Sequence, residues 1–288
     1  MPRARVSLTL IAAFFALYFI WGSTYLVIRI GVESWPPMLM AGCRFIIAGA
    51  ILFAWMLWRG APLPSLKQCL SAGAIGILLL SCGNGGVTVA EHWGVASGVA
   101  ALAVATVPLF TLVFGRFFGN RTNALEWAGI ALGLLGIVLL NLGSNLQGSP
   151  AGAALIIFAA ATWAFGSVWS RRLDLPAGAM ASAVEMLVGG LLSGERLEQM
   201  PTAAGWGALA YLVVFGSIIA FSAYMYLLAN VRPAAATSYA YVNPAVAVML
   251  GVVFAGEHIG LAESLAMAVI ISAVVLIGLP QWRRGPAN

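Results

Sequence analysis

The chain has 288 residues, of which 62% are hydrophobic and only 8% are charged. Soluble globular proteins carry about 25% charged residues, so this composition excludes an ordinary water-soluble fold and predicts an integral membrane protein. The net charge of +5 comes from single basic residues scattered between apolar runs, a pattern typical of membrane topology and not of nucleic-acid binding. The three cysteines, Cys43, Cys69 and Cys82, form no CxxC pair and predict neither a disulfide framework nor a metal site.

Ten segments are apolar enough to cross a bilayer, which takes about 20 residues of helix. In chain order they are 8–28, 37–58, 70–90, 95–117, 124–142, 150–169, 177–193, 206–228, 234–255 and 261–279. Tryptophans stand near several of their ends, where membrane interfaces favour aromatic side chains. The seventh segment is the shortest: as a helix it reaches only about 25 Å, against roughly 30 Å of hydrocarbon.

The basic residues predict the orientation of these spans. Arg44 lies inside a span, and the loops on one side contain only Arg29 and Arg196. The loops on the other side contain all the remaining basic residues, which are Arg3, Arg5, Arg59, Lys67, Arg116, Arg121, Arg171, Arg172, Arg232, Arg283 and Arg284. Because Lys and Arg gather in cytoplasmic loops, we expect a multi-pass protein of the cell inner membrane with both termini in the cytoplasm.

Marker residues recur in the same order in two halves of the chain, 1–145 and 146–288. The pairs are Trp21 with Trp163, Arg44 with Glu185, Pro108 with Pro244, and Glu126 with Glu263. Each half holds five predicted spans, and repetition of an odd number of spans inverts the second half relative to the membrane. We therefore predict an all-α integral membrane protein of ten transmembrane helices, built as two inverted five-helix repeats.

Arg44 and Glu185 are the formal charges that lie well inside predicted spans. A charge at that depth is costly and usually faces a cavity or a partner. Three interpretations are open. Arg44 binds an anionic substrate group while Glu185 binds a cationic group or a proton; the two form a structural ion pair; or Glu185 extends to the membrane interface.

Other residues within the spans are candidates for a translocation cavity. Two tryptophans at corresponding positions would stack on a substrate, with ordinary packing as the alternative. Asn84 lies between glycines that would loosen its helix and expose backbone polar groups. Besides Arg44 and Glu185, the candidate cavity residues are Trp21, Tyr25, Asn84, Trp163, Tyr239 and Asn243.

Pro108 and Pro244 are candidates for helix kinks that take part in gating. A proline inside a helix frees the carbonyl four residues earlier, here those of Val104 and Ala240. A static kink is the alternative for both.

The only two histidines follow glutamates, in Glu91-His92 and Glu257-His258. Two such pairs would form a metal site or a proton sensor only if the two loops met. We interpret both pairs as solvated loops outside the membrane, and we predict no metal site and no cofactor.

Several motifs resemble those of the EamA family of the drug/metabolite transporter superfamily. They are Ile20-Trp-Gly-Ser-Thr-Tyr25, Gly83-Asn-Gly85, Ala105-Thr-Val-Pro108, Trp163-Ala-Phe-Gly-Ser167 and Ser238-Tyr-Ala-Tyr-Val-Asn-Pro244. The resemblance covers essentially the whole chain. It implies ten helices in two inverted repeats around a central cavity, alternating access, and export or uptake of metabolites such as amino acids. The departure is the seventh span, which is shorter than is usual in the family.

The function expected from these patterns is that of a secondary transporter for a small-molecule substrate in the lipid bilayer, with Glu185 as the residue for any coupling to protons. A non-transporting membrane subunit is the main alternative, and the short seventh span favours it. A membrane-embedded enzyme is less favoured because Asp174, the sole aspartate, falls in a loop and no histidine falls mid-span.

Overall fold

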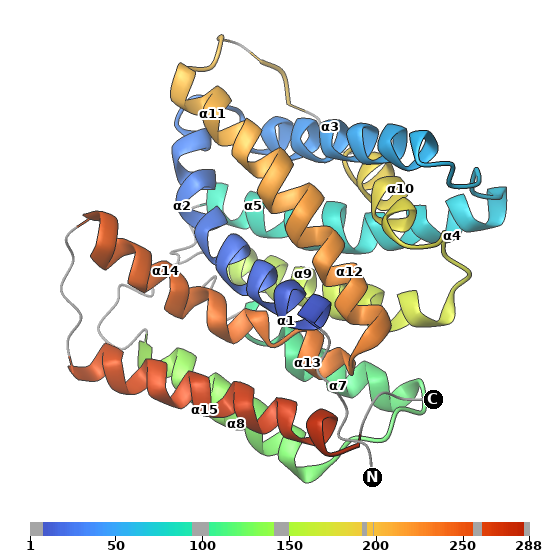
Figure 1. Cartoon of the computed structure of the whole chain (residues 1–288). Helices are drawn as coiled ribbons and strands as arrows, with labels where there is room; N and C mark the ends of the chain where they lie inside the picture. The colour runs from blue at the N-terminus through green and yellow to red at the C-terminus, as the bar shows by residue number, and fades with distance from the viewer. Residues whose placement is uncertain are drawn as a thin grey trace.

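The computed structural model describes residues 8–93, 104–140, 150–191, 195–197, 199–255 and 261–284, and every regular element within them is a helix (Figure 1). The α-helices are α1 (Leu8–Phe15), α2 (Trp21–Val32), α3 (Pro37–Trp58), α4 (Leu66–Gly76), α5 (Gly85–His92), α7 (Val107–Phe117), α8 (Ala124–Leu140), α9 (Pro150–Trp169), α10 (Ala179–Gly189), α11 (Ala203–Tyr211), α12 (Ala220–Asn230), α13 (Pro233–Ala236), α14 (Tyr239–Ala255) and α15 (Leu261–Arg284). The all-α prediction is confirmed for this part of the chain.

Within the described residues, four helical stretches are long and apolar enough to cross a membrane: Pro37–Trp58, Leu66–Ala90, Pro150–Arg172 and Ala203–Asn230. Shorter apolar helices include Leu8–Thr24, Val107–Phe117 and Ala179–Gly189. A helix satisfies its backbone hydrogen bonds internally, which a spanning segment in lipid requires. The count of ten spans stays a prediction.

The part of the chain that the structure describes contains three π-helical stretches, η1 (Ala16–Ile20), η2 (Ile77–Asn84) and η4 (Leu212–Ile219). Each joins two α-helices into one longer rod, and η3 (Ser170–Arg172) is a single 3-10 turn after α9. Short π-helical insertions are often found at functional sites. The sequence analysis did not anticipate them.

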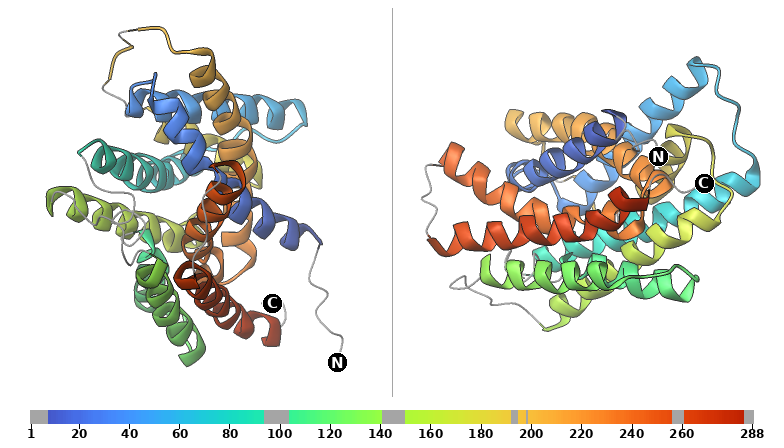
Figure 2. Two further views of the ribbon diagram at one scale, coloured as in Figure 1. Left: turned by 90° about the vertical axis from the view of Figure 1, so that its left-hand side faces the viewer. Right: turned by 60° about the horizontal axis from the view of Figure 1, so that its bottom comes forward.

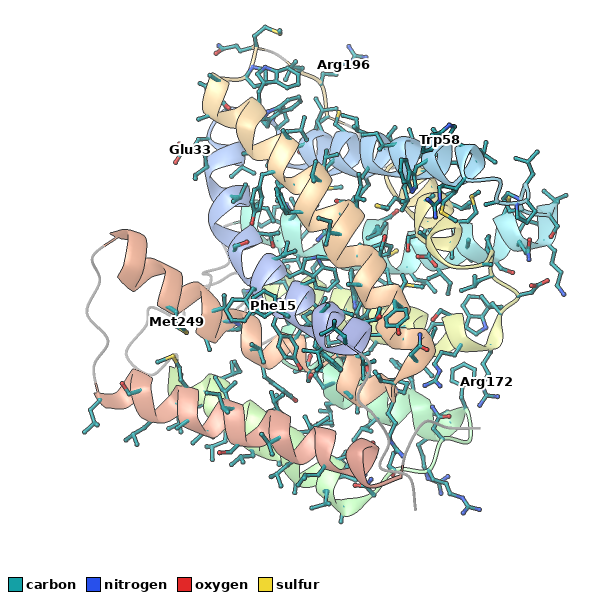
Figure 3. The ribbon with its side chains drawn as sticks, viewed as in Figure 1. Phe15, Glu33, Trp58, Arg172, Arg196 and Met249 are labelled. Carbon is teal, nitrogen blue, oxygen red and sulfur yellow. The ribbon has the colours of Figure 1, made fainter. Side chains whose placement is uncertain are left out.

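Helices α8 and α15 pack side by side along one side of the bundle (Figures 1 and 2). They share a separate apolar core that includes Ile130, Ile137, Ile270 and Ile277. The larger core lies among the other helices. Outside the bundle, Phe15, Trp58 and Met249 (Figure 3) are 61%, 75% and 48% exposed, as expected of side chains that face lipid.

The seventh predicted span, 177–193, is shorter still in the structure. Helix α10 has 11 residues and extends about 16 Å, well short of the roughly 30 Å hydrocarbon thickness. Gly178, with φ of +58°, precedes it, and Gly190 follows its last residue. Residues 180–186 are all buried, so α10 is an internal helix that the neighbouring spans enclose.

Glycines bring the backbone of α10 against the backbones of α3 and α4. A Cβ at Gly49 in α3 would lie 2.9 Å from the Ala183 carbonyl oxygen, and one at Gly76 in α4 would lie 2.2 Å from that of Glu185. A Cβ at Gly189 would lie 2.7 Å from the Gly76 carbonyl oxygen. Small residues at helix contacts allow this close approach, which favours helix association in membranes.

Pro244 lies inside α14, as predicted for a kink. Pro108, in contrast, lies in the first turn of α7 and follows a turn at Ala105 and Thr106. A proline in the first turn needs no backbone N–H, so Pro108 starts α7 and does not kink it.

We expect Gly76→Ala to lower the free energy of unfolding by about 1–3 kcal/mol, the usual range for overpacking, because the new methyl group meets backbone atoms that cannot rotate away. Thermal unfolding of the purified protein in detergent measures this. The matched control is Gly207→Ala in α11, where a Cβ would have no atom within 4 Å and where alanine favours the helix. A Gly76→Ala melting temperature equal to that of the wild type would contradict the packing described here.

Candidate functional site

Four aromatic rings from four helices form one buried group, the aromatic cluster: Trp21, Trp163, Tyr224 and Tyr239. The ring centre of Tyr224 lies 5.4 Å from that of Trp21 and 5.6 Å from those of Trp163 and Tyr239. Trp21 lies 4.8 Å from Tyr239 and 5.8 Å from Trp163. The structure therefore brings together Trp21, Trp163 and Tyr239, which the sequence singled out. They surround Tyr224, which the sequence analysis did not identify.

Hydrogen bonds fix the orientation of the cluster. Trp163 Nε1 donates to the Tyr224 hydroxyl at 3.0 Å, and Trp21 Nε1 donates to the Gly216 carbonyl at 2.9 Å. The Ser167 hydroxyl donates to the Trp163 carbonyl, so the Tyr224 hydroxyl donates to Ser167 Oγ, 2.5 Å away. Buried tyrosine and tryptophan usually find such partners, and here the polar atoms of Trp21, Trp163 and Tyr224 all have one.

Arg44 lies next to the cluster on α3 and is 6% exposed. Its Nε donates to Ser217 Oγ at 2.7 Å, and its guanidinium carbon lies 4.7 Å from the centre of the Phe45 ring. Ser217 and Gly216 are neighbours in η4, so Arg44 and Trp21 converge on the same turn of that helix. The two Nη groups make no hydrogen bond to the described residues, which leaves them free to bind an anionic group.

Glu185 lies in the middle of α10 with a fully buried side chain. Neither carboxylate oxygen has a hydrogen-bond partner among the described residues. Its neighbours Ala183 and Met186 belong to the same apolar core as the rings of the aromatic cluster, and α10 packs against α12, the helix that contains Tyr224. Tight packing of the α10 backbone against α4 holds the carboxyl group at this depth.

Two of the three interpretations of these charges are wrong. The ion pairs found in the described part of the chain join Lys67 to Asp174 and Arg232 to Glu126, and neither contains Arg44 or Glu185. Complete burial of Glu185 likewise contradicts its extension to an interface. The remaining interpretation, that each charge serves a ligand or a proton, stays a prediction.

Asn243 is buried and has a structural role. Its amide nitrogen donates to the carbonyl oxygens of Tyr18 and Tyr239, each 3.2 Å away. The Tyr18 hydroxyl in turn shares a hydrogen bond of 2.7 Å with Ser238. These bonds join η1 to the start of α14.

Asn84 ends η2, and its carbonyl accepts from the Thr88 hydroxyl at 3.0 Å. The adjacent Gly83 contacts the Trp163 ring, because a Cβ there would lie 2.8 Å from a ring carbon. Asn84 is thus one residue from the cluster. Tyr25 belongs to α2, but its side chain lies outside the described residues.

The side chains of Glu91 and His92, and the whole of Glu257 and His258, also lie outside the described part of the chain.

Ser217 and Tyr224 are the site residues that sequence reasoning missed. They are seven positions apart in the helical stretch Ala203–Asn230, and residues two turns apart share a helix face. Two polar residues on one face of an apolar span would have been the signal.

Contacts join the two halves of the chain at one end of the molecule. The buried carboxylate of Glu126, at the start of α8, pairs with Arg232 through both oxygens, one of them 2.7 Å from Nη2. Arg232 also donates to the Arg121 carbonyl at 2.6 Å, and Arg172 donates to that of Phe118. A cavity of about 20 Å³ beside this pair has room for about one water molecule.

Other contacts join the halves near Glu33 and Arg196, far from Arg172 (Figure 3). The Glu195 carboxylate accepts from the backbone N–H groups of Met38 and Leu39, at 2.9 and 3.1 Å. These belong to the first turn of α3, where the helix dipole favours a negative charge.

Residues 8–142 and 150–279 match the sequence profile of the EamA-like transporter family. The chain belongs to this family. The resemblance inferred from the motifs is confirmed, and family membership indicates a transporter.

Similar proteins include the "uncharacterized inner membrane transporter YedA" of Escherichia coli (strain K12), which is 57% identical over 97% of this chain and 94% of its own length. A "probable amino-acid metabolite efflux pump" of the same bacterium is 28% identical over 54% of this chain and 50% of its own length. A solved crystal structure superposes with a TM-score of 0.80 over 96% of this chain and 99% of its own, at 24% identity, and so shares the fold. These likenesses support a multi-pass inner-membrane transporter.

We expect Tyr224→Phe to destabilise the protein by about 1–3 kcal/mol, because it leaves the buried Trp163 N–H without an acceptor. Thermal unfolding in detergent measures the change. Tyr226→Phe on the same helix is the control, since the Tyr226 hydroxyl makes no hydrogen bond to the described residues. Equal effects of the two substitutions would show that the hydroxyl of Tyr224 has no special role.

Arg232→Ala should lower the free energy of unfolding by about 3 kcal/mol, since it leaves the Glu126 carboxylate buried and unpaired. Lys67→Ala is the matched control: its ion pair with Asp174 spans 3.9 Å between side chains that are 79% and 51% exposed, and such pairs contribute less than about 1 kcal/mol. Chemical denaturation of both variants tests the difference, and losses of similar size would refute it.

Proposed function

We propose that this protein is a secondary transporter that moves small metabolites, amino acids or related compounds among them, across the inner membrane by alternating access. The observation that carries the proposal is the pair of buried charges beside the aromatic cluster, Arg44 and Glu185, neither of which has an ionic partner among the described residues.

Buried ionisable groups in membrane proteins are costly and mark substrate or ion pathways. Arg44 adjoins the cluster through Gly216 and Ser217, and Glu185 lies on α10, which packs against α12, the helix that contains Tyr224. The rings supply a flat apolar surface between an anion-binding and a cation-binding group. That combination suits a small amphipathic metabolite.

Alternating access requires interactions that hold the two halves together at each end and that can break in turn. The Glu126–Arg232 pair at one end and the contact of Glu195 with α3 at the other have this character. With both in place the substrate site is closed to either side.

The inverted-repeat architecture, with halves 1–145 and 146–288 and ten spans, is part of the proposal. Two separate matches to the family profile, at 8–142 and 150–279, support it. The π-helical η2 and η4 also fall in the third span of each half, between two α-helical parts. Together with the basic residues of alternate loops, this arrangement supports a cytoplasmic position for both termini.

A non-transporting membrane subunit is the second candidate, because α10 is too short to span a bilayer. The relationship with the amino-acid efflux pump supports transport instead.

Flux of radiolabelled amino acids and related metabolites into liposomes containing the purified protein, with and without a pH gradient, tests the proposal. We expect saturable uptake, and a reduction of at least about tenfold in Arg44→Ala, since a hydrogen bond to a charged group contributes about 1.5–3 kcal/mol. Arg196→Ala, which changes an exposed loop arginine, is the control and should transport normally.

Absence of flux for every compound, with the protein correctly folded, would favour the subunit. Normal flux in Arg44→Ala would remove Arg44 from the mechanism.

A further inference from the structure

Glu185 differs from the other buried carboxylate of the described residues, that of Glu126. Glu126 accepts hydrogen bonds from the Asn123 backbone and from Arg232. Glu185 is 0% exposed and both of its oxygens lack a partner. An ionised carboxylate without partners is very unfavourable in a medium of low polarity, so in this closed state a proton or a bound cation must neutralise Glu185.

The surroundings of Glu185 decide which kind of cation fits. Glu185 belongs to no group of three or more His, Cys, Asp or Glu side chains within the described residues, whereas metal ions take several such ligands. Helix α10 packs against α12, and the ring of Tyr224 on α12 contacts those of Trp21, Trp163 and Tyr239. Aromatic faces attract ammonium groups, and clusters of them recognise organic cations.

The other titratable or charged side chains on the elements packed against α10 do not neutralise Glu185. They are Cys43 and Arg44 on α3, Lys67 and Cys69 on α4, Cys82 on η2, and Tyr224 and Tyr226 on α12. Arg44 binds Ser217, and Lys67 pairs with Asp174 at the surface. The hydroxyl of Tyr224 is neutral and donates to Ser167. The neutralising group must therefore come from outside the protein.

We propose that Glu185 and the aromatic cluster form a binding site for the protonated amine of an organic substrate, and that this ammonium group and a proton occupy the Glu185 carboxylate alternately. This inference rests on the proposed transport function and specifies one half of its substrate site. When an amine enters, its N–H groups pair with the carboxylate and the carboxyl proton leaves to the aqueous side to which the site is open. When a proton returns, the amine is released.

The exchange of a proton for an amine conserves charge. One proton leaves for each monovalent cation that binds, so the charge within the site does not change. An alkyl ammonium group stays protonated near pH 7, since amines of this type have pKa values of about 10. Protons released on binding then come from the protein and not from the ligand.

The test uses three ligands that share an indole ring and differ in the charge of the side chain: tryptamine, tryptophol and indole-3-propionate. Binding to the purified protein in detergent is followed by calorimetry, and proton release by an indicator dye in weak buffer. We expect tryptamine to bind at least about tenfold more tightly than the neutral alcohol or the acid, with about one proton released per ligand.

Glu185→Gln should abolish both the proton release and the preference for the amine, since an amide is neutral and holds no exchangeable acid. Glu185→Asp keeps the carboxyl group and should retain the proton release. Glu33→Gln, which alters an exposed glutamate at the end of α2, is the control and should behave as the wild type. Melting temperatures establish that each variant is folded.

Three results would overturn the inference: tryptamine binds no better than the alcohol or the acid, it binds without proton release, or the release persists in Glu185→Gln. The liposome assay separates this failure from failure of the transport proposal. If tryptamine binds with proton release but nothing crosses the membrane, the amine site stands and transport falls. If other metabolites cross at rates that Glu185→Gln leaves unchanged at every pH, transport stands and the amine site falls.

Discussion

The close contact of the α10 backbone with α3 and α4 is the constraint on which the rest of the structure depends. Gly49, Gly76 and Gly189 remove the side chains that would otherwise separate these helices. Lipid is as apolar as the helix surfaces, so association in a membrane depends on such packing more than on burial of apolar area. A short helix with a carboxylate at its centre is held in the interior because its neighbours fit its backbone directly.

Because this contact holds α10 in the interior, the site contains polar groups that have hydrogen-bond partners next to polar groups that lack them. Trp163, Tyr224 and Ser167 complete one another's hydrogen bonds and form a rigid neutral unit. Arg44 keeps a single hydrogen bond to Ser217, and Glu185 has none among the described residues. The neutral groups account for the stability of the cluster, whereas burial of each of the two charges costs free energy, which a proton or a cation at Glu185 and an anionic group at Arg44 would offset. This contrast is the physical basis for the substrate site that we propose between them.

The two halves of the chain have similar sequence patterns, but their helices differ in length. Arg44 lies on α3, which has 22 residues, whereas its counterpart Glu185 lies on α10, which has 11. The long helix reaches the outer surface of the bundle at Trp58, while the short one is enclosed. Glu195, soon after α10, accepts hydrogen bonds from the first turn of α3. The shortened segment therefore connects one end of the molecule to its centre.

The sequence by itself determined that the chain is an all-helical membrane protein of the EamA-like family, because apolar composition, span length and motif order are local properties. It also singled out Trp21, Trp163, Tyr239, Arg44 and Glu185, since charges and aromatic residues stand out within apolar runs. Only the tertiary structure decided that the two charges do not pair, that Tyr224 is the centre of the cluster, that Asn243 ties η1 to α14, and that Pro108 begins a helix. Those outcomes depend on the rotation and depth of each helix relative to its neighbours. Packing at a few glycines sets this rotation and depth, and the residue pattern of a single segment does not contain it.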